Sequence, residues 1–375
     1  MNKTLSKVAL TIFVSLASLS ANAEYTFSLL NGLNGNNLEG NNSRALAINS
    51  SGQIVGYSFY SDGSSRATLW NNGVASNLAS LGGADSVALA INDSGQIVGH
   101  SNLANGQSNA TLWNNGTASN LGTLGGSNSS ALSINNSGQI VGWSYTSYGS
   151  YNATLWSGGA ITDLGAQLGN SKASAINNSG QIVGWSANAD GARAKLWDNG
   201  VVTGLDMLAS SSGGSYSNAY GINDSGKIVG NSTIANGQGH ATLWDSTVPF
   251  DLGTAPPAFT SYAFDINNSG QIVGTFYSQN SSFRAKLWDA GVETDLNSLL
   301  SASDVSAGWV LKEANAINEN GWIVGTASNS LLGISNQAFV LTSTAPVPEA
   351  GTSAMLLMGA GVMGFMARRR KQAAA

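Results

Sequence analysis

One dipeptide, Ile-Asn, returns seven times at nearly even spacing and divides most of the chain into similar units. It begins at residues 48, 91, 134, 176, 222, 266 and 317, so one unit is about 45 residues long. The first three copies continue as INSSGQIVGY, INDSGQIVGH and INNSGQIVGW. A period of this length is typical of propellers, helical arrays and other repeat architectures. The internal pattern of one unit decides among them.

Each unit contains four short apolar segments instead of one or two long ones. In the second unit they are VALAI (87–91), QIVGHS (96–101), ATLW (110–113) and TASNL (117–121), separated by NDSG, NLANGQSN and NNG. Such runs between turn-forming residues are strands, because a helix needs about ten residues or more. Charged residues make up only 9% of the chain and Gly contributes 47 of 375 residues, which also favours turns over helices. Four strands per unit predict an all-β, seven-bladed β-propeller of four-stranded blades.

The seventh unit ends after three strands, and we expect its fourth strand at the other end of the chain. YTFSLLNGLNG, from Tyr25, matches the fourth segment and following loop of other units, such as VASNLASLGG at 74–83. The N-terminal strand is therefore predicted to complete the last blade, which closes the ring and leaves no open sheet edge. The predicted propeller spans residues 24–345.

Three columns of the repeat indicate turns or packing. The Asn after each Ile can cap its hairpin turn, although a ring of amides that contacts a ligand at one mouth is the alternative. A second column contains only Ala, as expected where strands crowd near an axis. A Leu-Trp pair recurs in the third strand, and we expect its Trp to fill the space between blades instead of binding sugar. The Ala column holds Ala45, Ala88, Ala131, Ala173, Ala219, Ala263 and Ala314, and the Trp column holds Trp70, Trp113, Trp156, Trp197, Trp244 and Trp288.

Both ends of the chain are predicted to be targeting segments. Residues 1–23 combine Lys3 and Lys7 with an apolar run and the sequence Ala-Asn-Ala, which is the pattern of a secretory signal peptide. Residues 346–375 contain a short apolar stretch at 351–367, just long enough to cross a membrane, followed by a basic cluster that the positive-inside rule keeps in the cytoplasm. The notable residues of this tail are Val347, Pro348, Glu349, Arg368, Arg369, Arg370 and Lys371.

The order of these features resembles the PEP-CTERM sorting signal of Gram-negative bacteria. Ala350 stands where that signal usually has a second proline. The resemblance implies export across the inner membrane to the cell envelope or extracellular space. It also implies processing by an exosortase-type enzyme and transient or retained anchoring through the C-terminal helix.

The repeat itself resembles the HAF family of bacterial extracellular repeats over residues 25–342. The motifs SGQIVGxS, Ala-x-Leu-Trp and NNGxxxxLxxLGG carry the resemblance. The tripeptide His-Ala-Phe is present only in part, as HAT at 240–242 and QAF at 337–339. The family implies an exported, propeller-like protein and no established activity.

Charge and composition argue against several classes of function. Residues 24–347 contain nine Lys and Arg against 19 Asp and Glu, and this acidic balance disfavours nucleic acid, whose phosphates require clustered cations. The chain has no Cys, and its two histidines, His100 and His240, stand in different columns of nonadjacent units, which disfavours a metal site. No phosphate loop or nucleophile elbow is present. We expect no cofactor, with weak Ca²⁺ binding at a mouth loop as the alternative because Asp93 and Asp224 lie in turns.

The column after QIVG varies while its surroundings stay constant, which makes it the candidate ligand surface. Its aromatic and amide side chains can stack on sugar rings, and the polar column before the Ala of the third strand can supply hydrogen bonds. Drift of an exposed surface explains the same variation. The variable column holds Tyr57, His100, Trp143, Trp185, Asn231, Thr275 and Thr326. The polar column holds Arg66, Asn109, Asn152, Arg193, His240, Arg284 and Gln337.

Two functions remain open at this point. The first is a noncatalytic protein of the cell envelope or extracellular matrix, whose propeller binds polysaccharide or another exported protein. The second is an exported glycan lyase or hydrolase with its site in the central channel. Such an enzyme needs paired carboxylates or a His-Arg cluster that breaks the sevenfold pattern. The two longest linkers, at 205–218 and 296–313, carry few ionisable groups, which favours the noncatalytic function.

Overall fold

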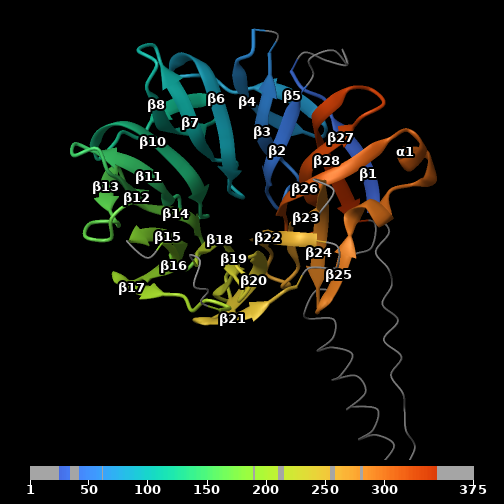
Figure 1. Ribbon diagram of the computed structural model, residues 1–375. Coiled ribbons are helices and arrows are strands. Elements are labelled where there is room, and N and C mark those ends of the chain that lie inside the picture. The colour runs from blue at the N-terminus through green and yellow to red at the C-terminus, as the bar shows by residue number, and fades with distance from the viewer. Residues whose placement is uncertain are drawn as a thin grey trace, which may run out of the picture.

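Seven four-stranded antiparallel sheets stand around one axis, which confirms the predicted seven-bladed propeller (Figure 1). The computed structural model describes residues 25–33, 42–60, 62–188, 191–209, 215–253, 258–278 and 282–343. The predicted signal peptide at 1–23 and the sorting tail at 346–375 lie outside these residues. Within the described part of the chain, no helix has both the length and the apolar character needed to cross a membrane.

The strands of each blade follow the chain from the central axis outward. Blades 1 and 2 are β2 (Ser43–Ile48), β3 (Ile54–Phe59), β4 (Ser65–Asn71) and β5 (Val74–Asn77), then β6 (Gly82–Ile91), β7 (Ile97–Leu103), β8 (Ser108–Asn114) and β9 (Thr117–Asn120). Blades 3 and 4 are β10 (Gly125–Ile134), β11 (Ile140–Thr146), β12 (Tyr151–Ser157) and β13 (Ala160–Asp163), then β14 (Ser171–Ile176), β15 (Ile182–Asn188), β16 (Gly191–Asp198) and β17 (Val201–Gly204). Blades 5 and 6 are β18 (Ser217–Ile222), β19 (Lys227–Thr233), β20 (Gly239–Asp245) and β21 (Val248–Asp251), then β22 (Ala258–Ile266), β23 (Ile272–Ser278), β24 (Phe283–Asp289) and β25 (Val292–Asp295).

Blade 7 joins the two ends of the described chain. It consists of β26 (Trp309–Ile317), β27 (Ile323–Asn329), β28 (Ile334–Ser343) and, as its outer strand, β1 (Tyr25–Leu30). Strand β1 runs antiparallel to β28, with Tyr25 opposite Ser343 and Leu30 opposite Ala338, and Figure 1 shows this blue strand in the red and orange blade. The predicted closure is therefore confirmed. Two short helices, η1 (Leu296–Leu299) and α1 (Ala302–Ser306), lie in the linker before β26.

Apolar side chains of neighbouring blades pack against each other and form the core. Between blades 2 and 3, for example, Val98 and Ala110 of one blade contact Ile140 and Trp156 of the next. The Trp column is 0–4% exposed, which confirms that these rings fill the space between blades. The Ala column is 0% exposed in all seven blades.

Steric crowding explains why each blade has Gly at the end of the QIVG segment. At Gly142, an added Cβ would overlap the carbonyl oxygen of Ser130 on the neighbouring inner strand. The inner strand changes register beside this point, between Ala131 and Ser133. The extra residue of this bulge, Leu132, lines the central channel.

Candidate functional site

The seven hairpin turns between the first and second strands surround one end of the channel, called here the turn mouth. Asn135 shows how the Ile-Asn motif works there. Its Oδ1 accepts hydrogen bonds from the backbone N–H of Gln139 (2.9 Å) and from Ser137 Oγ (2.8 Å), which confirms the predicted turn cap. Its Nδ2 donates to the carbonyl oxygen of Asn177 in the next blade, at 3.1 Å.

This second bond recurs in every blade and forms a closed ring, which the sequence did not predict. The Nδ2 of Asn318 in blade 7 donates to the carbonyl oxygen of Asn49 in blade 1 at 3.0 Å and so completes the circle. The seven donors are Asn49, Asn92, Asn135, Asn177, Asn223, Asn267 and Asn318. Each amide thus serves its own turn and the next blade.

Carboxylates of the turn mouth also join neighbouring blades through hydrogen bonds. Asp93 Oδ1 accepts from the N–H of Ser50 in blade 1 at 3.0 Å, and its Oδ2 accepts from Asn136 Nδ2 in blade 3 at 2.8 Å. Burial alone would raise the pKa of Asp93, but these hydrogen bonds outweigh it and the pKa is lowered. In the described ranges, no three His, Asp or Glu side chains are grouped as metal ligands.

The central channel contains a cavity of about 250 Å³, whose lining includes the bulge residues of the inner strands. On blades 1 to 3 these are leucines, whereas blades 5 and 6 contribute Tyr220 and Phe264. Asp265 beside them is partly buried, and it accepts from the N–H groups of Ile266 (2.9 Å) and Ile317 (3.0 Å). Burial raises the pKa of Asp265 to about 6, well above its ordinary value.

The opposite end of the channel is called here the rim, and the variable column lies near it. Tyr57, for example, pairs with Arg44 at the start of the inner strand, far along that strand from the turn. The column divides into two sectors. Its members on blades 1 to 4 are half-buried, whereas Asn231, Thr275 and Thr326 on blades 5 to 7 are buried. Within the first sector, His100 Nδ1 lies 3.2 Å from Ser130 Oγ, and burial lowers the pKa of His100.

Four aromatic rings on blades 3 and 4 form a continuous group at the rim, called here the aromatic cluster. The ring centroids of Trp143 and Tyr151 are 6.0 Å apart, and those of Tyr151 and Trp185 are 6.1 Å apart. Tyr145 lies 5.7 Å from Trp143 and 5.9 Å from Tyr151. The structure thus connects the two predicted tryptophans through Tyr151, and Tyr145 packs beside it; the sequence pattern singled out neither tyrosine. Tyr145 could have been found, because it follows Trp143 by two residues and so shares its face.

A lysine lies beside this cluster. Lys172 on the inner strand of blade 4 is directly opposite Trp185 in the ladder, so the two side chains share one face. Burial lowers the pKa of Lys172. The cluster therefore combines aromatic faces with a cationic donor.

The polar column does not stand beside the variable column of its own blade. Tyr57 pairs with Ala67, whereas Arg66 pairs with Ser58, so the two columns lie on opposite faces of the sheet. Arg66 itself lies over the ring of Tyr60, at 5.4 Å.

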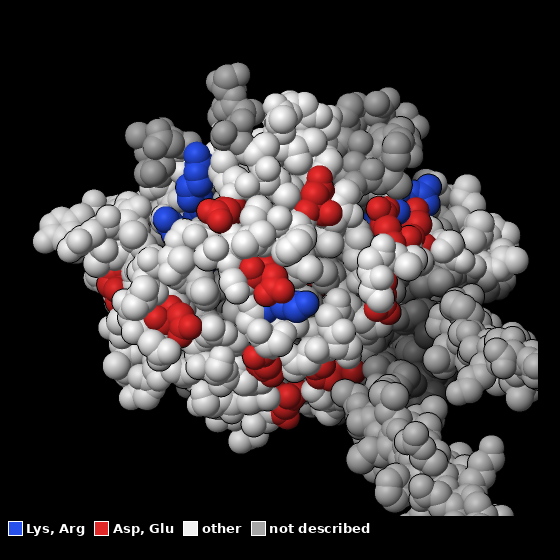
Figure 2. Space-filling model, turned by 90° about the horizontal axis from the view of Figure 1, so that it is seen from below, with Lys and Arg blue, Asp and Glu red and all other residues white. Residues whose placement is uncertain are grey.

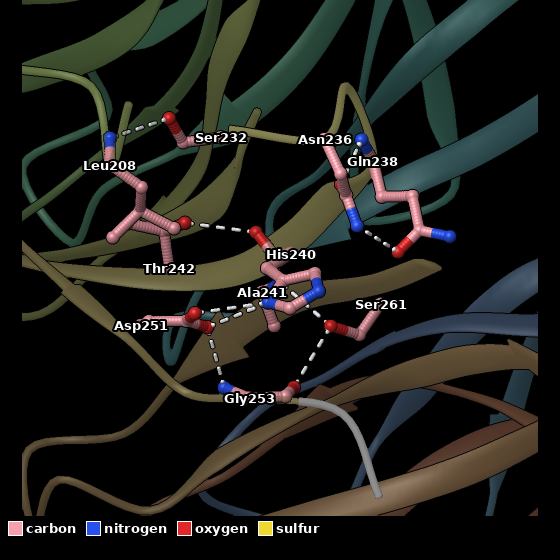
Figure 3. Close-up of polar contacts among 10 residues, drawn as sticks. All are labelled: Leu208, Ser232, Asn236, Gln238, His240, Ala241, Thr242, Asp251, Gly253 and Ser261. Atoms are coloured by element: carbon pink, nitrogen blue, oxygen red, sulfur yellow. Dashed lines mark hydrogen bonds and ion pairs between the residues drawn. The ribbon is translucent and has the colours of Figure 1, made fainter. Parts of the chain in front are cut away.

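Several members of the polar column bind the outer strand of their own blade. His240 Nδ1 lies 3.0 Å from both carboxylate oxygens of Asp251, whose Oδ1 also accepts from the N–H of Gly253 (Figure 3). Asn152 contacts Asp163 in the same way, at 2.9 Å. Arg193 instead donates to the carbonyl oxygen of Ser215. These contacts give most of the polar column a structural task.

Charge on the surface agrees with the acidic balance of the sequence. Figure 2 shows Asp and Glu side chains scattered over one face of the molecule, with few Lys and Arg among them. Two basic side chains, Arg284 and Lys312, line a groove between blades 6 and 7.

Comparison with known protein families identifies two segments. Residues 185–338 match the family described as protein of unknown function (DUF3466), and residues 346–371 match the PEP-CTERM protein-sorting motif. The second match confirms the sorting tail, implies exosortase-type processing, and is consistent with export to the cell envelope or extracellular space. The HAF resemblance and the signal peptide stay predictions. No curated protein has significant sequence similarity to the chain.

Several solved structures are similar to this chain. A puromycin-hydrolyzing peptidase from Mycobacterium tuberculosis has a TM-score of 0.53 and 10% identity, with 87% of this chain and 53% of that chain covered. The propeller domain of the trilobed protease from Pyrococcus furiosus has a TM-score of 0.49 and 10% identity, covering 80% and 93%. A fucose-specific lectin from Aleuria aurantia has a TM-score of 0.41 and 15% identity, covering 68% and 95%. At 10% identity, the likeness to the peptidase indicates a shared fold and nothing about activity.

Proposed function

We propose that this protein is an exported, noncatalytic propeller of the cell envelope or extracellular matrix that binds polysaccharide at its rim. The PEP-CTERM motif supports export. The aromatic cluster of Trp143, Tyr145, Tyr151 and Trp185 is the observation that carries the binding function.

The cluster has the properties that a sugar site needs. Its rings are half-buried, so each is held by neighbours while part of its surface stays open to a ligand. An apolar ring surface packs against the C–H face of a sugar, and the Tyr hydroxyls and Lys172 supply polar groups for its hydroxyls. Because the rings come from two blades, an extended polymer can contact both.

Two carboxylates of the turn mouth, Asp93 and Asp224, support a noncatalytic role. Asp93 and Asp224 lie on blades 2 and 5, and each accepts from the backbone N–H of the preceding blade, at 3.0 and 2.9 Å. Hydrogen bonds that lower the pKa of both side chains hold them as structural acceptors. A general acid for glycan cleavage needs the opposite shift. Asp265 and Glu319 do have a raised pKa, but each already accepts hydrogen bonds from backbone N–H groups. The donors are the N–H groups of Ile266 and Ile317 for Asp265 and that of Asn268 for Glu319.

Binding to immobilised polysaccharides tests the proposal. We expect the purified full-length chain to be retained by at least one exported bacterial polysaccharide. Trp143→Ala and Trp185→Ala should each weaken retention by at least about fivefold, because an aromatic contact contributes about 1 kcal/mol beyond its buried area. Tyr148→Ala is the matched control, because Tyr148 lies in the same blade, is 95% exposed and is outside the cluster.

Two results would contradict this function. Retention by none of the polysaccharides would remove the binding proposal. Turnover of a retained polymer would favour the alternative, an exported lyase or hydrolase.

A further inference from the structure

The groove between blades 6 and 7 has a composition unlike the rest of the surface. It encloses about 680 Å³ and is lined by two cations, Arg284 of β24 and Lys312 of β26. Phe283, which is 36% exposed, forms part of its wall. Ser282, Ser328 and Ser335 are also in the lining.

This groove arises where the repeat is broken. At the other six interfaces, a Ser on the inner strand accepts a hydrogen bond from the N–H of an Ala on the third strand of the preceding blade. These residues are Ser43, Ser86, Ser129, Ser171, Ser217 and Ser261. In blade 7 the buried Leu311 takes the corresponding place, because it pairs with Ala327 as Ser43 pairs with Ser58.

Lys312 is an extra residue in this strand. Leu311 pairs with Ala327 and Glu313 pairs with Thr326, so Lys312 bulges between two paired residues. Its carbonyl oxygen accepts from Thr275 Oγ1 of blade 6 at 2.8 Å, which fixes the bulge against the neighbouring blade. Its Nζ donates to the carbonyl oxygen of Ser335 at 3.1 Å and to Asn336 Oδ1 at 3.4 Å. The bulge therefore holds an ammonium group in the groove.

Neither cation is neutralised within the described part of the chain. The ion pairs found there join Arg44 to Glu313 at 3.6 Å, Lys286 to Glu293 at 2.6 Å, and His240 to Asp251. Arg284 and Lys312 are in none of them. On a protein with a strong excess of Asp and Glu, two unpaired cations in one groove form a local site for an anion.

We propose that this groove binds the carboxylate of an acidic polysaccharide, with one uronate unit between Arg284 and Lys312. A guanidinium binds a carboxylate through two parallel hydrogen bonds, and the ammonium adds a third donor. The serine hydroxyls match the hydroxyls of the sugar, and the Phe283 ring offers a surface for its C–H face. This inference rests on the proposed glycan binding and assigns the acidic sugar to a site apart from the aromatic cluster.

Calorimetric titration of the full-length chain with an oligogalacturonate tests the site. We expect binding that weakens as salt rises, because the contacts are ionic. Arg284→Gln and Lys312→Gln should each weaken it by about tenfold, because each removes a charge-assisted contact. Lys227→Gln is the matched control. It removes the same charge at the turn mouth, and five other blades already have Gln at this position.

Three further ligands distinguish a uronate site from a general anion site. The carboxyl-reduced oligosaccharide should not bind to the groove, and equal binding of that neutral form would overturn the proposal. Preference for a sulfated oligosaccharide or for oligoglutamate would also overturn it, in favour of a sulfate or an acidic peptide.

The same titrations distinguish this proposal from the rim site. If Trp143→Ala and Trp185→Ala abolish uronate binding and Arg284→Gln leaves it unchanged, the groove is refuted and the rim stands. If Arg284→Gln and Lys312→Gln weaken it about tenfold while the Trp variants bind normally, the groove stands, and loss of polysaccharide retention in the Trp variants tests the rim separately. Thermal unfolding of each variant checks that the propeller is intact.

Discussion

The two ends of the propeller channel are built from the same seven blades, yet they differ sharply in sequence. At the turn mouth an Asn occupies one position in every blade, and its side chain reaches the next blade. At the rim, the column that begins with Tyr57 changes from aromatic to amide to hydroxyl around the ring. The comparison shows that a repeat position stays uniform where its side chain bonds to the neighbouring blade. A position varies where the blade folds without a contact from that side chain.

The largest change in the free energy of unfolding is expected from removing one Asn side chain of the turn mouth. Asn135→Ala should lower the free energy of unfolding by about 3 kcal/mol, because it leaves buried groups of its own turn and of blade 4 without partners. Asn136→Ala, at the next and exposed position, should cost about 0.5 kcal/mol. Urea unfolding measures both variants. Equal losses would show that the ring of amides does not lock the blades.

The pH dependence of the free energy of unfolding tests Asp265, which lies in the channel between the turn mouth and the rim. The pKa of Asp265 is raised to about 6 from an ordinary value of 3.8, so its contribution to stability is complete below pH 4. That contribution is lost as pH rises through 6, and amounts to at most about 3 kcal/mol.

Asp265→Ser provides the comparison for this titration. Ser133 has the corresponding place in blade 3, where its Oγ accepts from the N–H of Ile176 at 3.3 Å. The variant should therefore keep a bond to the next blade while losing the pH dependence. Urea midpoints between pH 4 and pH 7 measure the effect, and parallel curves for the two proteins would contradict the assignment to Asp265.

The fold could be predicted from the sequence because it depends on the pattern of short apolar segments within one unit and on the number of units. Four strand-length segments per unit predicted the blade, and the split seventh unit predicted the closure through Tyr25. The amide ring was not predictable in the same way. Spacing shows that Asn135 caps a turn, but the reach of its Nδ2 to Asn177 depends on the angle between blades.

The sites were predicted only in part, for reasons of register. Trp143 and Trp185 were found because they stand in one varying column, whereas Tyr151 starts the next strand and joins them only in space. Arg284 was singled out from its column, but its groove partner Lys312 is absent from every column because it is a bulge. A one-residue insertion of this kind changes which side chains face a groove, and the repeat alignment alone does not show it.

The smallest change in the free energy of unfolding is expected at His240. The comparison predicts that this side chain has a structural role and does not bind ligand. Asn109 and Asn152 occupy the same column and bind Asn120 and Asp163 of the outer strand, at 3.1 and 2.9 Å. His240→Asn should therefore keep a contact to Asp251 and change the free energy of unfolding by less than about 0.5 kcal/mol.

His240→Ala is the counterpart that removes the contact. It should cost about 1 kcal/mol, because the side chain is largely buried while Asp251 is exposed and can turn to water. Both variants should retain polysaccharide as the unmodified chain does. If His240→Asn lost retention while its stability was unchanged, the polar column would contact a ligand. The comparison would then be contradicted, because it assigns His240 a structural role and places ligand binding in the variable column of the rim.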